Sequence, residues 1–410
     1  MATFFLIIIY LAFISLGLPD SLLGVAWPLI RPELGAPLAA AGYLSMTVAG
    51  GTIVSSLASG SVIHRFGTGK VTLVSCMLTA CALLGFSFSS SVLWLALLAV
   101  PLGLGAGAVD AGLNNYVASH YKAHHMSWLH CFWGIGATLG PIIMSRNILS
   151  EHSWRSGYLA VAWIQFALVA LLFLTLPLWK RTGHEAAASP VPAAAEQPVQ
   201  EAGDGSRHFI KSGVVKPLQI KGVKLTLLTF LLYCGVETTM GLWGSSFLVN
   251  VKGVDVAVAA QWVSLYFSGI TAGRLITGFV TLKVKSRILI RAGQLTALTG
   301  AVLLLLPLPL YCSLAGFILV GLGCAPIFPC LLHETPARFG KEHSQRIMGY
   351  QMAMAYTGTT LLPPLLGLMA TRTPLGMGIF PYLVTLYAVA MMFSSEKINS
   401  LLKTRFAGDK

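Results

Sequence analysis

Four ionisable side chains lie inside long apolar stretches of the sequence: the carboxyl groups of Asp20, Asp110 and Glu237 and the guanidinium of Arg274. An ionised group in the hydrocarbon core of a bilayer is costly unless it is paired or hydrated. A low dielectric also penalises the charged form of a carboxyl group, so such an acid can take a proton from one side and release it on the other. We therefore predict that these four residues face the protein interior, that the three acids carry protons, and that Arg274 forms an ion pair with a carboxylate that protonation breaks. The alternatives are static hydrogen-bonded acids and a static ion pair.

Arg274 has two candidate partners. Asp110 is at a similar predicted depth in its own apolar stretch. Glu237 lies at the midpoint of the stretch that precedes Arg274, about 7 Å away in depth at a rise of about 1.5 Å per residue. The sequence leaves both pairings open.

Amide and aromatic side chains near these acids are candidates for binding a polar solute. Asn114 lies four residues after Asp110, so both share one helix face. Sugars suit such a site, because their flat faces stack on aromatic rings and amides bond their hydroxyl groups. Structural roles in helix contacts or at the membrane surface are the alternative, and His130 is also a possible proton relay. The predicted substrate-binding residues are Asn114, Asn115, His130, Trp133, Trp243, Gln261, Gln351 and Tyr356.

The composition indicates that membrane-spanning helices position these residues. Of 410 residues, 10% are charged and 55% are hydrophobic, and the mean hydropathy is +0.76, which excludes a soluble enzyme and a disordered chain. About 20 apolar residues cross a bilayer as a helix, and continuous rather than alternating runs exclude a β-barrel. Twelve spans are predicted, at 4–30, 40–63, 71–90, 93–118, 126–147, 155–179, 224–250, 256–282, 288–307, 311–333, 344–370 and 376–394.

The basic residues predict the orientation of these spans. With both termini in the cytoplasm, 21 of the 27 Lys and Arg residues lie on the cytoplasmic side, five lie outside and Arg274 lies within a span. Topology thus explains the net charge of +13, and we expect a monomer in a lipid bilayer, the inner membrane, with no nucleic-acid partner. No Lys or Arg precedes Arg31, so the first span is expected to be retained rather than cleaved as a signal peptide.

The seven cysteines form no CxxC or Cys/His cluster, so we expect neither a disulfide framework nor a metal site.

The sequence divides into two similar halves. Residues 181–222 are rich in Ala, Pro, Gly and Glu and predict a cytoplasmic linker between six-helix bundles at 1–180 and 223–410. Landmarks recur between these bundles at an offset of about 218 to 222 residues, which indicates an internal duplication. The matches are Gly17-x-x-Asp20-x3-Gly24 with Gly235-x-Glu237-x3-Gly241, Gly60 and Arg65 with Gly278 and Lys283, Gly103-Leu-Gly105 with Gly321-Leu-Gly323, and Gly136-x4-Pro141 with Gly358-x4-Pro363.

The chain resembles the major facilitator superfamily over its whole length, and two motifs carry this resemblance. The segment Gly60-Ser-Val-Ile-His64-Arg65-Phe-Gly67-Thr-Gly69-Lys70 is similar to the superfamily signature G-x-x-x-D-R-x-G-R-[RK], with His64 in place of the usual Asp. Gly136-x3-Gly140-Pro141 is part of the antiporter signature, but Ile-Met follows where that signature has Gly-Gly. The resemblance implies a fold of two six-helix bundles and a cytoplasmic gate. The gate residues would be Gly60, His64, Arg65, Gly67 and Lys70.

Three further segments resemble the fucose:proton-symporter branch of sugar permeases. They are Ser15-Leu-Gly-Leu-Pro-Asp20, Asp110-Ala-Gly-Leu-Asn114-Asn115-Tyr116 and Trp128-Leu-His130-x-x-Trp133-Gly-x-Gly136-Ala. This resemblance implies a symporter in which one acid on the first span and one on the fourth handle substrate and proton. Asp20 and Asp110 occupy those places, although the fucose permease has Glu on its fourth span.

Together these observations predict a secondary transporter that works by alternating access, driven by an ion gradient. The chain has no GxxxxGK[ST] sequence for ATP binding. Nor does it have a metal cluster or nucleophile–base set that would indicate a membrane enzyme. We expect proton-coupled uptake of a sugar or a similar small polar solute, without a cofactor. Sodium is the alternative coupling ion, and proton-linked export of drugs or metabolites is the alternative function.

Overall fold

The computed structural model describes residues 2–121, 123–188, 217–281 and 283–408. Its first seven helices come from the predicted N-terminal half, and α7 continues eight residues beyond the predicted start of the linker. Most of that linker, residues 189–216, lies outside the described residues. The seven helices are α1 (Ala2–Asp20), α2 (Leu22–Glu33), α3 (Ala40–Phe66), α4 (Thr68–Ser87), α5 (Val92–His120), α6 (Ala123–Glu151) and α7 (Trp154–Ala188).

The second half begins with a short 3-10 turn and repeats the all-helical pattern. The chain segments that connect its helices are short, as membrane bundles require. Its elements are η1 (Pro217–Gln219), α8 (Val223–Lys252), α9 (Val256–Val280), α10 (Ser286–Leu305), α11 (Leu310–Cys324), α12 (Ile327–Phe339), α13 (Lys341–Arg372), η2 (Gly376–Ile379) and α14 (Phe380–Gly408).

The fourteen α-helices of the described residues correspond to the twelve predicted spans because two spans are interrupted. The first span breaks at Ser21, between α1 and α2, two residues after Pro19. The tenth span breaks at residues 325–326, between α11 and α12, where Pro326 has no N–H group for the helix ladder. By apolar length, Phe5–Glu33 and Leu310–Phe339 each count as one span.

Ten segments of the described chain are long and apolar enough to cross a membrane. The two remaining long helices, α6 and α13, carry more polar residues. Their positions explain this composition, because α6 packs between α1 and α9, and α13 packs between α8 and α3. A helix at the contact between two bundles presents less surface to lipid, so it needs fewer apolar residues.

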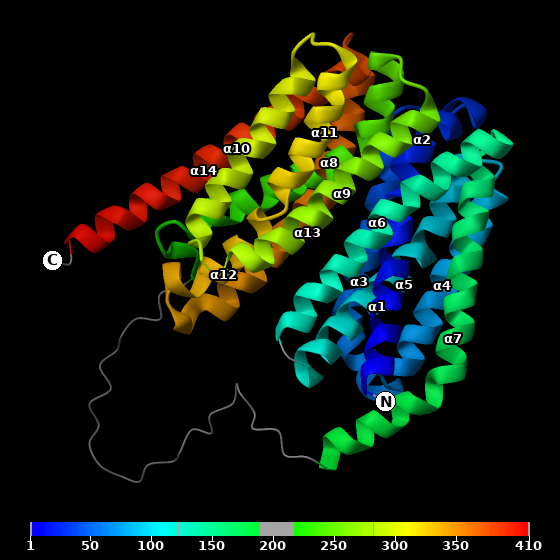
Figure 1. Cartoon of the computed structure of the whole chain (residues 1–410), viewed down its shortest axis with the longest axis horizontal. Coiled ribbons are helices and arrows are strands. Elements are labelled where there is room, and N and C mark those ends of the chain that lie inside the picture. Colours follow the sequence, from blue (N-terminus) through cyan, green and yellow to red (C-terminus); the bar gives the residue numbers. More distant parts are fainter. Residues whose placement is uncertain (1, 122, 189–216, 282, 409–410) are drawn as a thin grey trace.

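Four helix pairs make the main contacts between the two halves: α6 with α9, α3 with α13, α2 with α8 and, over fewer residues, α2 with α9. Glycines bring these helices close together: a Cβ on Gly24 would lie 2.3 Å from the carbonyl oxygen of Gly241, and a Cβ on Gly42 would lie 2.6 Å from Cα of Pro364. The first part of the first span, α1, instead packs mainly within its own bundle. The ribbons therefore meet at the α2 end and diverge toward the end where α1 begins (Figure 1).

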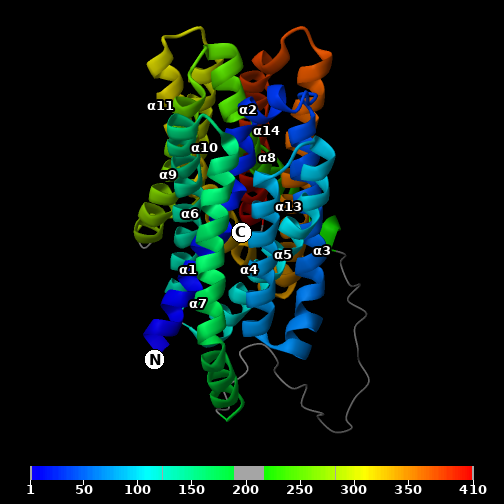
Figure 2. The same ribbon diagram turned by 90° about the vertical axis from the view of Figure 1, so that its right-hand side faces the viewer.

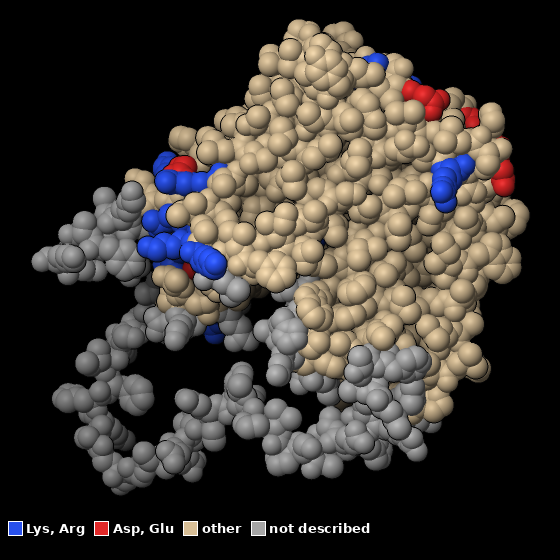
Figure 3. All heavy atoms as spheres, viewed as in Figure 1, with Lys and Arg blue, Asp and Glu red and all other residues tan. Residues whose placement is uncertain are grey.

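Within each half the long helices run roughly side by side, and the two groups lie at an angle to each other in Figure 1, whereas they look nearly parallel in Figure 2. On the face drawn in Figure 3, Lys, Arg, Asp and Glu gather toward the two ends of the helices and leave the flank between them without charge. A charge-free belt is what the hydrocarbon region of a bilayer requires. The chain is thus a multi-pass membrane protein.

Candidate functional site

An ion pair lies in the middle of the C-terminal half. Nη2 of Arg274 on α9 lies 2.9 Å from Oε1 of Glu237 on α8, and the two side chains are 19% and 16% exposed. Tyr266, also on α9, donates its hydroxyl proton to the backbone carbonyl of Glu237 at 2.9 Å. Of the two partners that the sequence left open for Arg274, the structure pairs it with Glu237.

Trp133 on α6 links this ion pair to the N-terminal half. Its indole Nε1–H donates to Oδ2 of Asp20 at 2.8 Å. The guanidinium carbon of Arg274 lies 5.4 Å from the centroid of the same indole ring, within cation–π range. Asp20, Trp133, Arg274 and Glu237 therefore form one continuous chain of contacts from α1 through α6 and α9 to α8.

Close backbone packing holds Trp133 in place. A Cβ on Gly17 of α1 would lie 2.1 Å from the carbonyl oxygen of Trp133. A Cβ on Gly134, the next residue of α6, would lie 2.3 Å from Oγ1 of Thr271 on α9. Only glycine fits at these two positions, because α6 lies very close to α1 of its own bundle and to α9 of the other bundle at the same level.

Asp110 on α5 forms a second polar group in the N-terminal half. The Asn114 amide donates to Asp110 Oδ1 at 2.8 Å and to its backbone oxygen at 2.9 Å, as the i, i+4 spacing predicts. The side chain of Asn115 lies outside the described part of the chain.

Two of the predicted substrate-binding residues lie on α6 and α9, at the contact between the halves. His130 is exposed, one helix turn from Trp133, and its ring meets the Phe13 ring edge-on at 6.1 Å. Gln261 donates to Oγ of Ser145 at 3.1 Å, and Ser145 donates to the carbonyl of Ala257 at 2.8 Å. These bonds join α6 to α9 directly.

Two other predicted binding residues are fully buried and hydrogen-bonded. Trp243 donates from Nε1 to the carbonyl of Pro363 at 2.8 Å and is 0% exposed. Gln351, also 0% exposed, exchanges hydrogen bonds with Thr335. In this conformation the structure places both side chains within the C-terminal bundle, away from any surface that a solute reaches. Tyr356, by contrast, is 37% exposed.

The predicted gate lies at the junction of α3 and α4. His64, Arg65 and Lys70 are exposed, and a Cβ on Gly60 would meet no atom within 4 Å. Gly67 has φ = 81°, a conformation that favours glycine. This segment lies at the end where the two bundles diverge (Figure 1), and its gating role stays a prediction.

No feature of the sequence indicated the contacts that Ser145 and Tyr266 make. Ser145 and Tyr266 are small or aromatic residues in apolar helices, and no motif marks them. Their importance comes from neighbours that are distant in the chain, Ala257 and Gln261 for Ser145, and Glu237 for Tyr266.

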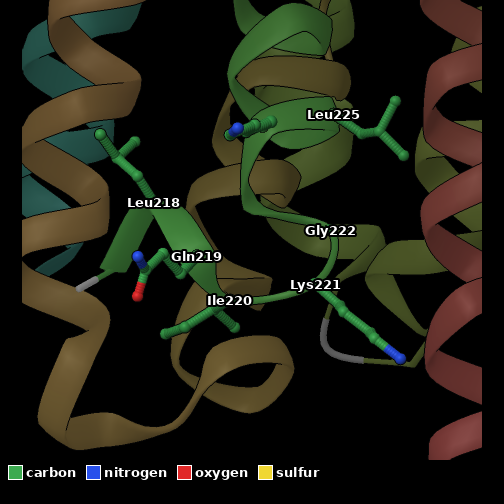
Figure 4. A pocket seen from close by; sticks show the side chains of 7 residues that line it. Leu218, Gln219, Ile220, Lys221, Gly222 and Leu225 are labelled. Atoms are coloured by element: carbon green, nitrogen blue, oxygen red, sulfur yellow. The ribbon is translucent and has the colours of Figure 1, made fainter. Parts of the chain in front are cut away.

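A surface depression lies away from this network, at the start of α8. Residues 218–222, 224 and 225 line it, with the Lys221 side chain pointing outward (Figure 4). Leu225 is twelve residues before Glu237 on α8, which corresponds to about 18 Å along the helix. The depression includes the last residues of the predicted linker, 218–222, and is separate from the ionisable groups.

Comparison with known proteins places the chain in a family. A family model described as "Major Facilitator Superfamily" matches residues 9–363 and again residues 225–405. The Bacillus subtilis glucose/mannose transporter GlcP is 24% identical over 349 residues, which cover 82% of this chain and 80% of that protein. "Bypass of stop codon protein 6" of Saccharomyces cerevisiae is 25% identical over 237 residues; the match covers 56% of this chain and about half, 48%, of the yeast protein.

Solved structures agree at the level of the fold. A bacterial homologue of the human lysosomal transporter Spinster, described as inward-facing and unoccupied, superposes with a TM-score of 0.71 at 12% identity, and the match covers 97% of this chain and 98% of that one. The second match of the family model, over residues 225–405, overlaps the C-terminal half of the first, as expected for an internally duplicated chain. The protein therefore belongs to the Major Facilitator Superfamily of membrane transporters.

Proposed function

We propose that this protein is a secondary transporter that takes up a sugar or a similar small polar solute together with a proton. The observation that carries the proposal is the continuous chain of contacts Asp20–Trp133–Arg274–Glu237, which joins the two halves at mid-membrane. Sugar as the solute class is supported by the glucose/mannose transporter GlcP, which aligns with most of the chain. We place the protein in the cell (inner) membrane with both termini in the cytoplasm, following the distribution of Lys and Arg.

The charge balance of the central groups favours a neutral or cationic solute over an organic anion. The three carboxyl groups outnumber the single guanidinium of Arg274, so the fully ionised set carries an excess of two negative charges. Arg274 is already paired with Glu237. An anionic solute would meet Asp20 and Asp110, which accept hydrogen bonds from Trp133 and Asn114 but form no ion pair among the described residues. Like charges in a low dielectric repel strongly.

The geometry suggests how a proton and a solute are coupled. Neutralising Glu237 removes its attraction for Arg274, and the guanidinium then needs another acceptor because an unpaired charge in the membrane is costly. A solute hydroxyl group or the Asp20 carboxylate can supply that acceptor. Either exchange changes the contacts between α9 of one half and α1 and α6 of the other, which is the motion that alternating access requires.

The described conformation fits one state of this cycle. At the α2 end the halves contact each other through α2 with α8 and α9, while α1 packs mainly in its own bundle. Under the proposed orientation this is an inward-facing state, closed on the outer side. Reopening the outer side must separate Gly24 from Gly241, which lie in direct backbone contact.

Proton-linked export of a cationic compound is the alternative function. The excess negative charge of the central groups suits a cation, and Gly136, Gly140 and Pro141 retain part of the antiporter motif. Sodium is the alternative coupling ion, since carboxylate and amide oxygens also coordinate it.

A proteoliposome assay tests the proposal. Uptake of labelled glucose, mannose and other sugars, and of cationic drugs, is measured with and without an imposed pH or sodium gradient. The proposal expects a pH gradient to drive accumulation of at least one neutral sugar, and Asp20→Asn, Asp110→Asn and Glu237→Gln to abolish that accumulation. Glu151→Gln, at the exposed end of α6, is the matched control. Accumulation that persists in all three variants, or that requires a cationic compound, contradicts the proposal.

A further inference from the structure

Trp133 occupies an unusual position for a residue that the sequence assigned to substrate binding. Its indole N–H is already committed to the Asp20 carboxylate at 2.8 Å. Its ring face is committed to Arg274, whose guanidinium carbon lies 5.4 Å from the ring centroid. One side chain therefore contacts an acid of the N-terminal half and the cation of the C-terminal half.

The backbone around Trp133 permits little adjustment. Gly17 packs on its carbonyl oxygen, and Gly134 packs on Thr271. A second pair of glycines, Gly136 and Gly140, continues the tight contact of α6 with α1, because Cβ atoms there would lie 2.0 Å from the Ile14 carbonyl oxygen and 2.5 Å from the Leu18 carbonyl oxygen. The indole can thus exchange partners only by a side-chain movement or by a movement of α9 relative to α6.

We infer that Trp133 is a positioning residue that couples Asp20 in one half to the Glu237–Arg274 pair in the other. This inference rests on the proposed function. A proton or a solute hydroxyl group that takes the Asp20 carboxylate away from the indole N–H also releases the ring from its fixed position beside Arg274. The state of Asp20 is thereby communicated to the ion pair without direct contact between the acids.

The Trp133→Phe variant separates the two contacts of the indole. Phenylalanine keeps an aromatic face for Arg274 but has no N–H group for Asp20. A hydrogen bond to an ionised carboxylate favours the ionised form, and its loss corresponds to an equilibrium change of about tenfold or more. We therefore expect the midpoint of the pH profile of uptake to move by about one pH unit toward alkaline pH.

Two further variants isolate the cause. In an Asp20→Asn background, Trp133→Phe should produce no additional shift, because the titrating partner of the indole is gone. Trp163→Phe is the matched control, since Trp163 is 64% exposed on α7. Expression level and thermal stability of every variant are measured, so that a folding defect is recognised.

A second readout needs no solute. Spin labels at Ser61 and Thr281, at the diverging ends of α3 and α9, report the separation of the halves in a cysteine-free background by double electron–electron resonance. We expect the wild-type distance distribution to depend on pH, with a midpoint that Trp133→Phe shifts by about one unit and Trp163→Phe leaves in place.

The outcomes are separable. A pH-dependent distance that shifts in Trp133→Phe supports the coupling role even if no tested sugar is transported, in which case the proposed solute is wrong. An unchanged midpoint in Trp133→Phe, additive effects of Trp133→Phe and Asp20→Asn, or a wild-type distance that ignores pH would each overturn the inference.

Discussion

The Glu237–Arg274 pair makes a quantitative prediction about stability. Removing one partner of a buried pair costs about 3–5 kcal/mol, because the remaining charge is left without compensation. Here the side chains are 16% and 19% exposed, so residual hydration lowers the expected cost of Glu237→Gln or Arg274→Gln to about 2–4 kcal/mol. The double variant leaves two neutral amides that can bond each other, so we expect it to lie within about 1 kcal/mol of wild type.

The measurement uses two cysteine thiols that are buried in the folded protein. Cys234 and Cys324 are buried near the pair, so a thiol-reactive fluorescent dye reports their exposure as detergent-solubilised protein is heated. Both single variants should melt clearly below wild type, and the double variant should recover most of the loss. Additive destabilisation in the double variant, or a single variant that melts like wild type, would refute an ionised pair.

An exposed ion pair serves as the control for this prediction. Arg291 on α10 contacts Glu396 on α14, and these side chains are 49% and 36% exposed. Exposed pairs contribute about 0–1 kcal/mol. Arg291→Gln should therefore shift the melting temperature far less than Arg274→Gln, and equal shifts would mean that burial is not the cause.

Three other substitutions address different parts of the account. Gly24→Val places a side chain against the Gly241 carbonyl, so it should disfavour the closed outer side and increase labelling of outer-side cysteines by membrane-impermeant reagents; unchanged labelling would show that this contact does not close the outer side. Glu33→Gln weakens the ion pair with Arg155 that ties α2 to α7, and we expect a loss of about 0.5–2 kcal/mol in thermal unfolding, since the pair is partly exposed, whereas no loss would assign this contact no role in stability. Asp110→Asn keeps an oxygen that accepts from the neighbouring amide, so it should fold normally yet lose gradient-driven accumulation while retaining sugar counterflow, and a variant that accumulates sugar normally would remove this acid from coupling.

The sequence predicts the spans well because each depends on local composition. A helix long enough and apolar enough to cross the membrane covers, at least in part, ten of the twelve predicted stretches. The interruptions at Ser21 and at residues 325–326 were less visible, since prolines within membrane helices do not always break them. Pro141 and Pro177, for example, lie inside continuous helices.

The sequence predicted how deep each candidate site residue lies along its helix, but not which neighbouring helix its side chain faces. Sequence position fixes how far a side chain lies along its helix, and it therefore left Asp110 and Glu237 as equal partners for Arg274. Which helix faces which is decided by packing across the bundle, including the glycine contacts of α6 with α1 and α9. Those contacts are distant in the chain, so the structure was needed to pair Arg274 with Glu237.

The same limit explains the residues assigned to substrate binding. Trp243 and Gln351 have side chains that suit a sugar, but both already have hydrogen-bond partners inside the C-terminal bundle. Trp133 has the right chemistry as well, and its N–H is bonded to Asp20. Residue type predicted which groups can bond, whereas tertiary packing decided what they bond to.

Proton movement during solute uptake tests the central claim most directly. Proteoliposomes that contain the protein are suspended in weakly buffered medium with a pH-sensitive dye, and glucose or mannose is added outside without an imposed gradient. We predict that sugar entry alkalinises the medium in wild type, and that Asp20→Asn, Asp110→Asn and Glu237→Gln each abolish the signal. Sugar entry without alkalinisation, or alkalinisation that survives in all three variants, would contradict the account.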